Sequence, residues 1–259
     1  MSTQIEKKLA KSLEREKAAN RAKDEFLAAL SHELRTPLNP VMLLASSGAS
    51  NDELPQQVRT DFDTICKNIE VESRLIDDLM DLTLIARGKL SLHRAKVDVH
   101  AILQDTISIV ENEMQKKQIF LRIHFLALHH EMFADAVRLR QIFWNVIKNA
   151  IKYTPGGGQI SLETEPFASD KLLVKIRDSG IGMSAEEITT VFDKFAQGGH
   201  GLGGLGLGLA ICRKLVELHS GSIYATSSGK GKGSVFSIIL PVIRQAKKKP
   251  QRTDSKLSQ

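Results

Sequence analysis

The chain has 259 residues, of which 42% are hydrophobic and 25% charged, a composition typical of folded globular proteins and not of disordered or collagen-like chains. The formal net charge is +6, but residues 242–259 hold six basic residues and one acidic residue, so nearly all of the excess lies there. The charge therefore gives no reason to expect a nucleic-acid-binding surface, and residues 242–259 are predicted to form a basic, disordered tail.

The two cysteines and the hydropathy pattern limit where the chain is expected to work. Cys66 and Cys212 lie in apolar surroundings without CxxC or Cys/His spacing, which argues against a disulfide scaffold or a structural zinc site and favours a reducing compartment. No apolar run approaches the roughly 18 residues that span a bilayer, and the first residues lack the apolar segment of a signal peptide. We expect a cytoplasmic protein without a membrane segment in this chain.

The first 88 residues predict a charged helical linker followed by a helical hairpin. Beyond residue 23, apolar residues recur at heptad spacing at Leu27, Leu30, Leu34, Val41 and Leu44. Residues 46–55 form a predicted break, and a second apolar stripe follows over residues 58–79. Because two such helices cover their apolar faces poorly, two hairpins are expected to pair as a four-helix bundle in a homodimer. The alternative is a monomer whose hairpin docks on the rest of the chain.

His32 is expected to face away from the first apolar stripe, because it lies about 200° around the helix from a stripe position two residues earlier. A solvated surface histidine is the simplest interpretation. Glu33, which would hold one ring nitrogen protonated, and Thr36 on the same face favour a nucleophilic imidazole instead. Pro37 and Pro40 each remove a helical hydrogen bond, so the helix is expected to bend just beyond His32.

From residue 89 the pattern becomes that of an α+β domain, which is expected to extend to residue 241. Helices are predicted over residues 97–114, 135–153 and 205–219, with a short helix capped by Ser184. Strands are predicted over residues 119–125, 159–165, 171–177, 223–226 and 234–240, with residues 130–133 as a short partner of the first strand. This mixture indicates a mostly antiparallel sheet with helices on one face.

The predicted helix over residues 135–153 has a polar face besides its apolar one. Asn145, Asn149 and Lys152 stack there at spacings of four and three residues, although asparagine disfavours a helix interior. One interpretation is a solvated face or an internal amide hydrogen bond. The other is a set of oxygen ligands for hydrated Mg²⁺ with an ammonium group beside them for phosphate.

Three glycine clusters follow, at residues 178–182, 204–208 and 229–233. Glycines let backbone amides approach phosphates closely, and the second cluster opens a helix whose N-terminus favours an anion. The first cluster carries Asp178 at the end of an apolar strand, where its carboxylate is suited to accept from an exocyclic amine. The third is interpreted as an ordinary turn. The context around these glycines fits neither a Rossmann site nor a Walker A loop.

Five blocks of the sequence resemble, in order, the motifs of sensor histidine kinases. They are SHELRTPL (31–38) for the H box, NVIKNAIKYT (145–154) for the N box, DSGIG (178–182) for G1, VFDKF (191–195) for the F box and GLGLGLAI (204–211) for G2. The resemblance implies a dimerisation and histidine-phosphotransfer hairpin over residues 20–88. It also implies an ATP-binding α/β sandwich of the Bergerat type over residues 89–241.

The resemblance further implies a kinase reaction on the hairpin. His32 would accept the γ-phosphoryl group of ATP, and Glu33 would be its acid/base partner. Thr36 matches the position that, in similar kinases, orients water for dephosphorylating a response regulator. The expected function is an ATP-dependent protein-histidine kinase that works as a homodimer and passes its phosphoryl group to an aspartate of a response-regulator receiver domain. A phosphatase-biased core and a non-catalytic ATP-gated scaffold are the alternatives.

The same resemblance implies a nucleotide site in the second domain. Asn149 would be the principal Mg²⁺ ligand with Asn145 in support, Lys152 would lie near phosphate, and Tyr153 would lie against the base. Asp178 would bind the adenine amino group. The pocket and its lid would be shaped by Gly180, Gly182, Gly204, Gly206 and Gly208. The lid departs from similar kinases in having His200 as its one possible cation, for which Lys194 in the F box would compensate.

Overall fold

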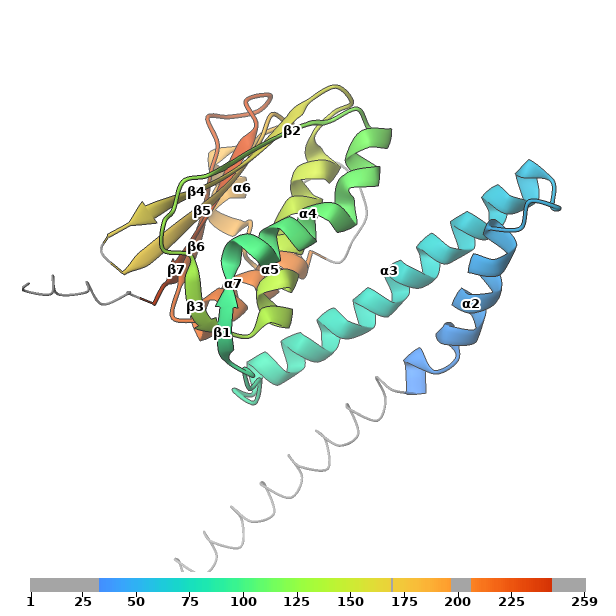
Figure 1. Ribbon diagram of the computed structural model, residues 1–259, viewed down its shortest axis with the longest axis horizontal. Coiled ribbons are helices and arrows are strands. Elements are labelled where there is room, and N and C mark those ends of the chain that lie inside the picture. The colour runs from blue at the N-terminus through green and yellow to red at the C-terminus, as the bar shows by residue number, and fades with distance from the viewer. Residues whose placement is uncertain (1–32, 169, 197–205, 244–259) are drawn as a thin grey trace, which may run out of the picture. The chain divides into compact units, whose positions relative to one another are not determined.

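The computed structural model describes residues 33–168, 170–196 and 206–243 (Figure 1). The chain divides into two units, Met1–Leu90 and Ser91–Gln259. His32, Gly204 and the predicted basic tail from residue 244 onward lie outside the described residues.

The first unit contains an antiparallel helical hairpin, as predicted. Helix α2 spans Leu38–Ala49 and helix α3 spans Gln56–Ala86. Three pairs mark their register: Arg35 with Asp77, Ser46 with Cys66, and Gly48 with Phe62. As the residue number rises from 35 to 48 along the first segment, the number of its partner on α3 falls from 77 to 62. The two helices therefore run side by side in opposite directions.

The predicted break at residues 46–55 begins too early, because α2 continues to Ala49. Gly48 lies inside the helix, where the ring of Phe62 occupies the space that a side chain would take; a Cβ added to Gly48 would lie 2.5 Å from that ring. The glycine therefore serves close packing of α2 on α3. The connection is made by residues 50–55 alone.

The interruption predicted near the prolines is present. Residues 33–35 are helical, residues 36–37 form a turn, and α2 starts directly after Pro37. Proline lacks the backbone N–H that would bond to the preceding turn, so the helix is broken at the position that follows the H box histidine in sequence.

The second unit is built on a five-stranded, mostly antiparallel sheet, as predicted. Its strands run in the order β2 (Phe120–Phe125), β4 (Gln159–Phe167), β5 (Lys171–Asp178), β7 (Ser234–Pro241) and β6 (Ser222–Thr226). The β2–β4 pair is parallel and the other three pairs are antiparallel. A long helical connection between β2 and β4 returns the chain in its original direction, which a parallel pair requires.

The expected partnership between residues 130–133 and the strand at 119–125 is wrong. Strand β3 (Glu131–Ala134) pairs instead with β1 (Ala95–Asp98). The last two residues of β1 fall within the helix predicted over residues 97–114. Helix α4 starts only at Val99 and runs to Lys116, because Asp98 caps it by accepting from the amides of His100 and Ala101.

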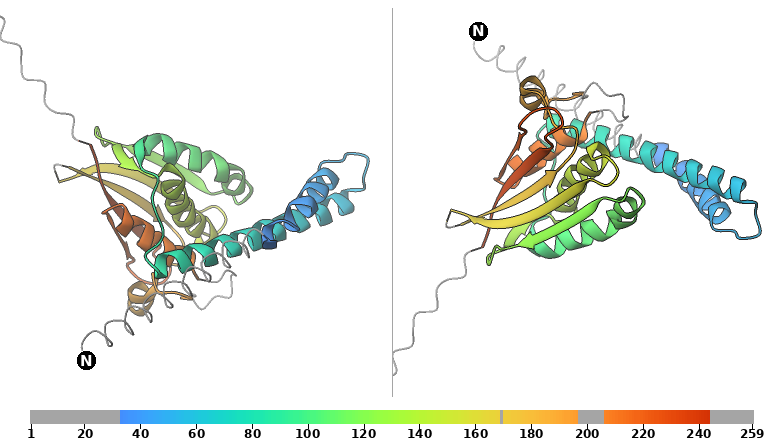
Figure 2. Two further views of the ribbon diagram at one scale, coloured as in Figure 1. Left: turned by 90° about the horizontal axis from the view of Figure 1, so that it is seen from below. Right: turned by 90° about the horizontal axis from the view of Figure 1, so that it is seen from above.

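Three helices, α4, α5 (Ala136–Tyr153) and α7 (Gly208–Leu218), cover one face of this sheet (Figures 1 and 2). The short helix α6 spans Ala185–Thr190 and begins with a capping box between Ser184 and Glu187. The apolar face predicted for α5 is confirmed, since its four members are at most 2% exposed: Leu139, Ile142, Val146 and Ala150.

One buried network joins the start of α5 to the end of α7. The side chain of Asp135 caps α5, and its backbone N–H donates to Nε2 of His219 at 3.1 Å. Nδ1 of His219 in turn donates to the carbonyl of Leu215 at 2.8 Å. Burial lowers the pKa of His219, outweighing the hydrogen bond to Leu215, so the neutral ring is favoured in the fold.

We predict that His219 makes the second unit less stable in acid. Its pKa is lowered by folding from 6.5, so its contribution to the free energy of unfolding is complete above pH 6.5 and is lost as the pH falls through the lowered folded value. Urea unfolding between pH 7.5 and 5 should show a weaker pH dependence for His219→Gln than for the wild type. The matched control is His124→Gln on an exposed position, which should keep the wild-type slope. Equal slopes for all three proteins would contradict the prediction.

Candidate functional site

The polar face of α5 meets the start of α7. Asn145 is 8% exposed, and its Nδ2 lies 3.5 Å from the carbonyl oxygen of Gly208, 63 residues away in sequence. Asn149 and Lys152, one and two turns further along α5, are half-buried. The N box and the G2 block are therefore neighbours, and Asn145 does not lie on a solvated face.

Helix α7 brings its positive end to this place. Gly208 is its first residue, and Leu207 before it provides no side-chain cap. The first amides of a helix have no partner within the helix, and the helix dipole adds positive potential there. The geometry therefore suits an anionic group such as a phosphate next to Asn145.

Asp178 lies at the end of β5 and is 6% exposed. Its Oδ1 accepts from the amides of Gly180 at 2.8 Å and Ser234 at 3.2 Å. Burial raises the pKa of Asp178, and these amide hydrogen bonds oppose the rise. The carboxyl group is thus a fixed acceptor in an enclosed place, suited to a ligand that donates a hydrogen bond.

The loop after Asp178 is attached to the end of α5 and the start of β4. The amide of Ile181 donates to the carbonyl of Tyr153 at 3.2 Å, while Ser179 and Gln159 exchange two hydrogen bonds. The ammonium group of Lys152 lies 4.8 Å from the ring centroid of Tyr153, within cation–π range. The G1 loop and the end of the N box therefore form one connected surface.

The third glycine cluster is a turn, as expected, but it also supports this loop. The amide of Gly231 donates to the carbonyl of Ile181 at 2.6 Å, and that of Gly233 donates to the carbonyl of Gly180 at 3.0 Å. Gly182 has φ +63°, and a Cβ added there would collide with the carbonyl of Gly229. This supporting role is not predictable from the sequence, in which the density of glycines is its one signal.

The F box contacts the start of the G2 block. The amide of Phe195 donates to the carbonyl of Gly206 at 3.1 Å, and both residues have positive φ angles, 64° and 67°. Lys194 is exposed beside them. Between these two residues in sequence lies the segment 197–205, which contains Gly204 and is outside the described residues.

Among the described residues of the second unit, Asn145 contacts Gly208, and Lys152 contacts Tyr153. Tyr153 in turn is bonded to the loop that contains Asp178, Gly180 and Gly182. Glu33 and Thr36 belong to the first unit, where both are exposed. Their placement next to His32 in sequence is the feature that connects them to the predicted reaction.

Comparison with known proteins decides the family. Residues 22–88 match the His Kinase A (phospho-acceptor) domain, and residues 134–244 match the histidine kinase-, DNA gyrase B- and HSP90-like ATPase. The chain belongs to the sensor histidine kinases. Hybrid signal transduction histidine kinase D of Dictyostelium discoideum is 33% identical over 87% of this chain, and sensor protein GacS of Pseudomonas syringae pv. syringae is 35% identical over 88% of it. The chain spans only 18% and 26% of these two relatives.

Solved structures show the same architecture. Full-length ShkA in complex with AMPPNP matches with a TM-score of 0.70 and 27% identity. The matched region covers 86% of this chain and 46% of the ShkA chain. Histidine kinase ThkA in complex with the response regulator protein TrrA has a TM-score of 0.55 at 22% identity, covering 85% of this chain and 61% of that one, and shows the fold. The ATPase match identifies an ATP-binding domain. Among the helices that the structure describes, none is long and apolar enough to cross a membrane.

We predict that position 182 requires glycine for two reasons: its positive φ angle and its close contact with the third glycine cluster. Gly157 is a matched control in the same unit, with φ +76° and open space around it. Gly157→Ala should cost about 1–2 kcal/mol of the free energy of unfolding, the ordinary penalty for a left-handed residue. Gly182→Ala should cost clearly more, because its methyl group must displace the Gly229 carbonyl. Equal losses in chemical unfolding would show that the contact is unimportant.

Proposed function

We propose that this chain is the catalytic core of an ATP-dependent protein-histidine kinase that phosphorylates its own His32. Residues 1–88 would be the linker and phosphotransfer unit, and residues 89–241 the ATP-binding domain. The observation that carries the proposal is the contact of Asn145 with Gly208, in a chain whose phospho-acceptor domain contains His32. The buried carboxyl group of Asp178 in the same unit supports it.

The residues of the second unit divide into a base end and a phosphate end. Asp178 would accept a hydrogen bond from the adenine amino group, and the ring of Tyr153 would pack on the base. At the other end, Lys152 and the first amides of α7 would bind the phosphates. The F box and the glycines around Gly206 would close over the nucleotide, with Lys194 as an additional cation.

The donor set on α5 fits a magnesium ion. Mg²⁺ takes oxygen ligands and keeps much of its water, and Asn149 offers an amide oxygen from a half-buried position next to Asn145. When bound, the ion supplies neutralisation of the triphosphate charge. The chain itself contributes the ammonium group of Lys152 and the dipole of α7 to the same task.

The reaction would be an in-line displacement. A lone pair on the imidazole of His32 would attack the γ-phosphorus, the bond from that phosphorus to the bridging oxygen would break, and ADP would leave. Glu33 would hold or accept the proton of the second ring nitrogen. The rate would depend mainly on positioning, since the one covalent bond that the protein forms is that from His32 to the transferred phosphorus.

The phosphoryl group would next pass to an aspartate of a response regulator. The carboxylate would attack phosphorus and the P–N bond would break, restoring His32. ThkA, which shares the fold, was solved with a response regulator protein, and we expect a receiver domain of this class as the partner here. Thr36 would orient water for a separate, opposing reaction, in which water attacks the phosphoryl group of the regulator and inorganic phosphate leaves its aspartate.

The exposed apolar stripe of the hairpin supports a homodimer. Residues of both predicted stripes keep much of their surface exposed in the single chain: Leu34 44%, Val41 45%, Leu44 71%, Ile65 41% and Leu79 54%. Apolar faces of this length are normally covered in soluble proteins. A second copy of the hairpin would cover them by forming the four-helix bundle expected from the sequence.

The cysteines agree with a cytoplasmic location, which we infer for this chain. Cys66 and Cys212 are free thiols, and Cys212 is buried, with its Sγ 3.6 Å from the carbonyl oxygen of Ile142. Free thiols persist in a reducing compartment.

The acceptor assignment predicts the outcome of a labelling experiment. Incubation with γ-labelled ATP and Mg²⁺ should give the wild type an acid-labile, base-stable phosphate, as expected for phosphohistidine. His32→Gln should take up no label, whereas His93→Gln, a histidine of the second unit, should label like the wild type. Label on His32→Gln at the wild-type level would refute His32 as the acceptor.

Nucleotide affinity separates the two halves of this proposal. His32→Gln should bind ATP with wild-type affinity, because the residue lies outside the ATP-binding domain. Asp178→Ala should bind ATP at least about tenfold more weakly and label poorly, since a lost hydrogen bond to a charged group costs about 1.5–3 kcal/mol. If Asp178→Ala binds and labels normally, the base end of the site lies elsewhere.

The dimer proposal predicts that a charge on the stripe separates the copies. Leu44→Glu should shift the sedimentation of the chain from dimer to monomer, because the new carboxylate would be buried without a partner. Ile109→Glu is the matched control, since Ile109 is similarly exposed, at 62%, but lies on α4 of the other unit. A wild type that sediments as a monomer would contradict the proposal outright.

A further inference from the structure

Three potential metal ligands converge where α4 begins. Asp98 ends β1, His100 lies in the first turn of α4, and His130 immediately precedes β3. Each offers one ligand atom, and these atoms all lie within 4.8 Å of one another. None of the three belongs to the nucleotide site, and the proposed kinase reaction gives them no role.

The backbone holds these residues at fixed separations. The amide of Val99 donates to the carbonyl of His130 at 2.9 Å, and Asp98 is paired with Glu131 in the β1–β3 ladder. The Cα atoms of the cluster therefore belong to a strand pair and a helix start, which are rigid elements. A site built on such elements needs only side-chain rotation to form.

The side chains already contact one another. Nδ1 of His130 lies 2.7 Å from Oδ1 of Asp98, and Nε2 of His100 lies 2.8 Å from the hydroxyl oxygen of Thr164. The ring of His100 is stacked between Phe125 and His130, with centroid distances of 4.6 and 4.1 Å. The cluster is thus a compact group of nitrogen and oxygen donors next to an aromatic wall.

We propose that Asp98, His100 and His130 bind one divalent transition-metal ion, such as Zn²⁺, through a carboxylate oxygen and two imidazole nitrogens. Imidazole ligands select zinc, copper or nickel over magnesium and calcium, which prefer oxygen. Three protein ligands leave the remaining position of a tetrahedral ion to water. The site would be separate from the Mg²⁺ of the nucleotide site in both place and ligand chemistry.

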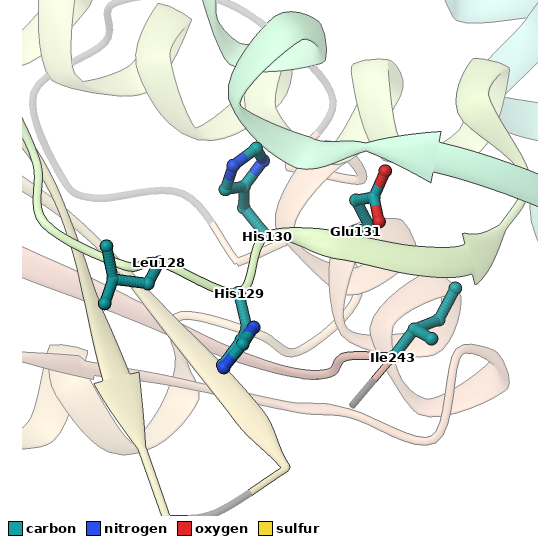
Figure 3. Close-up of a pocket in the computed structure, with 5 residues that line it drawn as sticks. All are labelled: Leu128, His129, His130, Glu131 and Ile243. Atoms are coloured by element: carbon teal, nitrogen blue, oxygen red, sulfur yellow. The ribbon is translucent and has the colours of Figure 1, made fainter. Parts of the chain in front are cut away.

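Binding requires one ring to turn, because parallel stacked imidazoles do not direct their lone pairs at one point. The ring that turns would be that of His130, which also lines a cavity of about 190 Å³ together with Leu128, His129, Glu131 and Ile243 (Figure 3). Turning the ring would break the hydrogen bond between His130 and Asp98. Each of these two residues would bind the metal ion instead. Metal–ligand bonds of about 2.0–2.2 Å place tetrahedral ligands closer together than 4.8 Å, so the cluster must also contract slightly.

The test is a calorimetric titration of the full chain with ZnCl₂ at pH 7.5, without nucleotide. The wild type should take up one equivalent, and His100→Gln and His130→Gln should each weaken binding at least about tenfold. His129→Gln is the matched control, because His129 is adjacent in sequence but points to the opposite side of the chain from His130 (Figure 3). It should bind zinc like the wild type.

A conservative variant protects the test against misfolding. Asp98→Asn keeps a side-chain oxygen to cap α4, since asparagine is as good a cap as aspartate, but it removes the anionic ligand. It should retain the thermal unfolding midpoint of the wild type and still lose zinc affinity. No uptake by the wild type, undiminished uptake by the His100, His130 and Asp98 variants, or an equal loss in His129→Gln would each overturn the proposal. None of these outcomes depends on kinase activity, so the kinase proposal stands or falls separately.

Discussion

The arrangement of the second unit depends on how one buried carboxyl group is satisfied. Asp178 has lost most of its water, a cost that is recovered only if backbone amides replace the lost hydrogen bonds. The amides of Gly180 and Ser234 do so, and in doing so they join the end of β5, the G1 loop and the start of β7. The loop in turn donates from Ile181 to the last residue of α5. One solvation requirement therefore fixes the proposed base end of the site relative to α5, the helix with the polar face.

Local signals predicted the elements whose ends are set by neighbouring residues. The start of α5 was predictable because the Asp135 side chain caps it, and its end because Thr154 and the following Pro-Gly run stop a helix. The pairing of β1 with β3 and the parallel register of β2 on β4 were not, because strand partners are chosen by packing across the whole domain. Gly48 misled for a related reason: a glycine signals either a turn or a close approach, and only the position of Phe62 distinguishes them.

The candidate site likewise has a part that the sequence predicts and a part that it does not. Residue types and spacing on α5 were enough to select Asn145, Asn149 and Lys152, because they share one helical face. The contact between Asn145 and Gly208 spans 63 residues, and the support of Gly182 by Gly229 joins two loops, so neither follows from any periodicity. The histidines at 100 and 130 were overlooked because they are separated by 30 residues and form a cluster only once β1 pairs with β3. Sequence patterns thus select candidate groups within an element, and the tertiary fold supplies those assembled between elements.

The position of the proposed phosphate end depends on a pair of core helices. Helices α5 and α7 touch at three places in antiparallel register: Asp135 with His219, Ile142 with Cys212, and Asn145 with Gly208. The outer two contacts are separated by about ten residues on each helix, or about 15 Å at 1.5 Å per residue. Hydrophobic packing is not directional, so the apolar contacts alone would let one helix slide along the other. The polar contact at each end prevents this sliding. Asn149 and the first amides of α7 are consequently held in register by a buried histidine at the far end of the same helix pair. A change that loosens His219 should therefore weaken nucleotide binding at the proposed site.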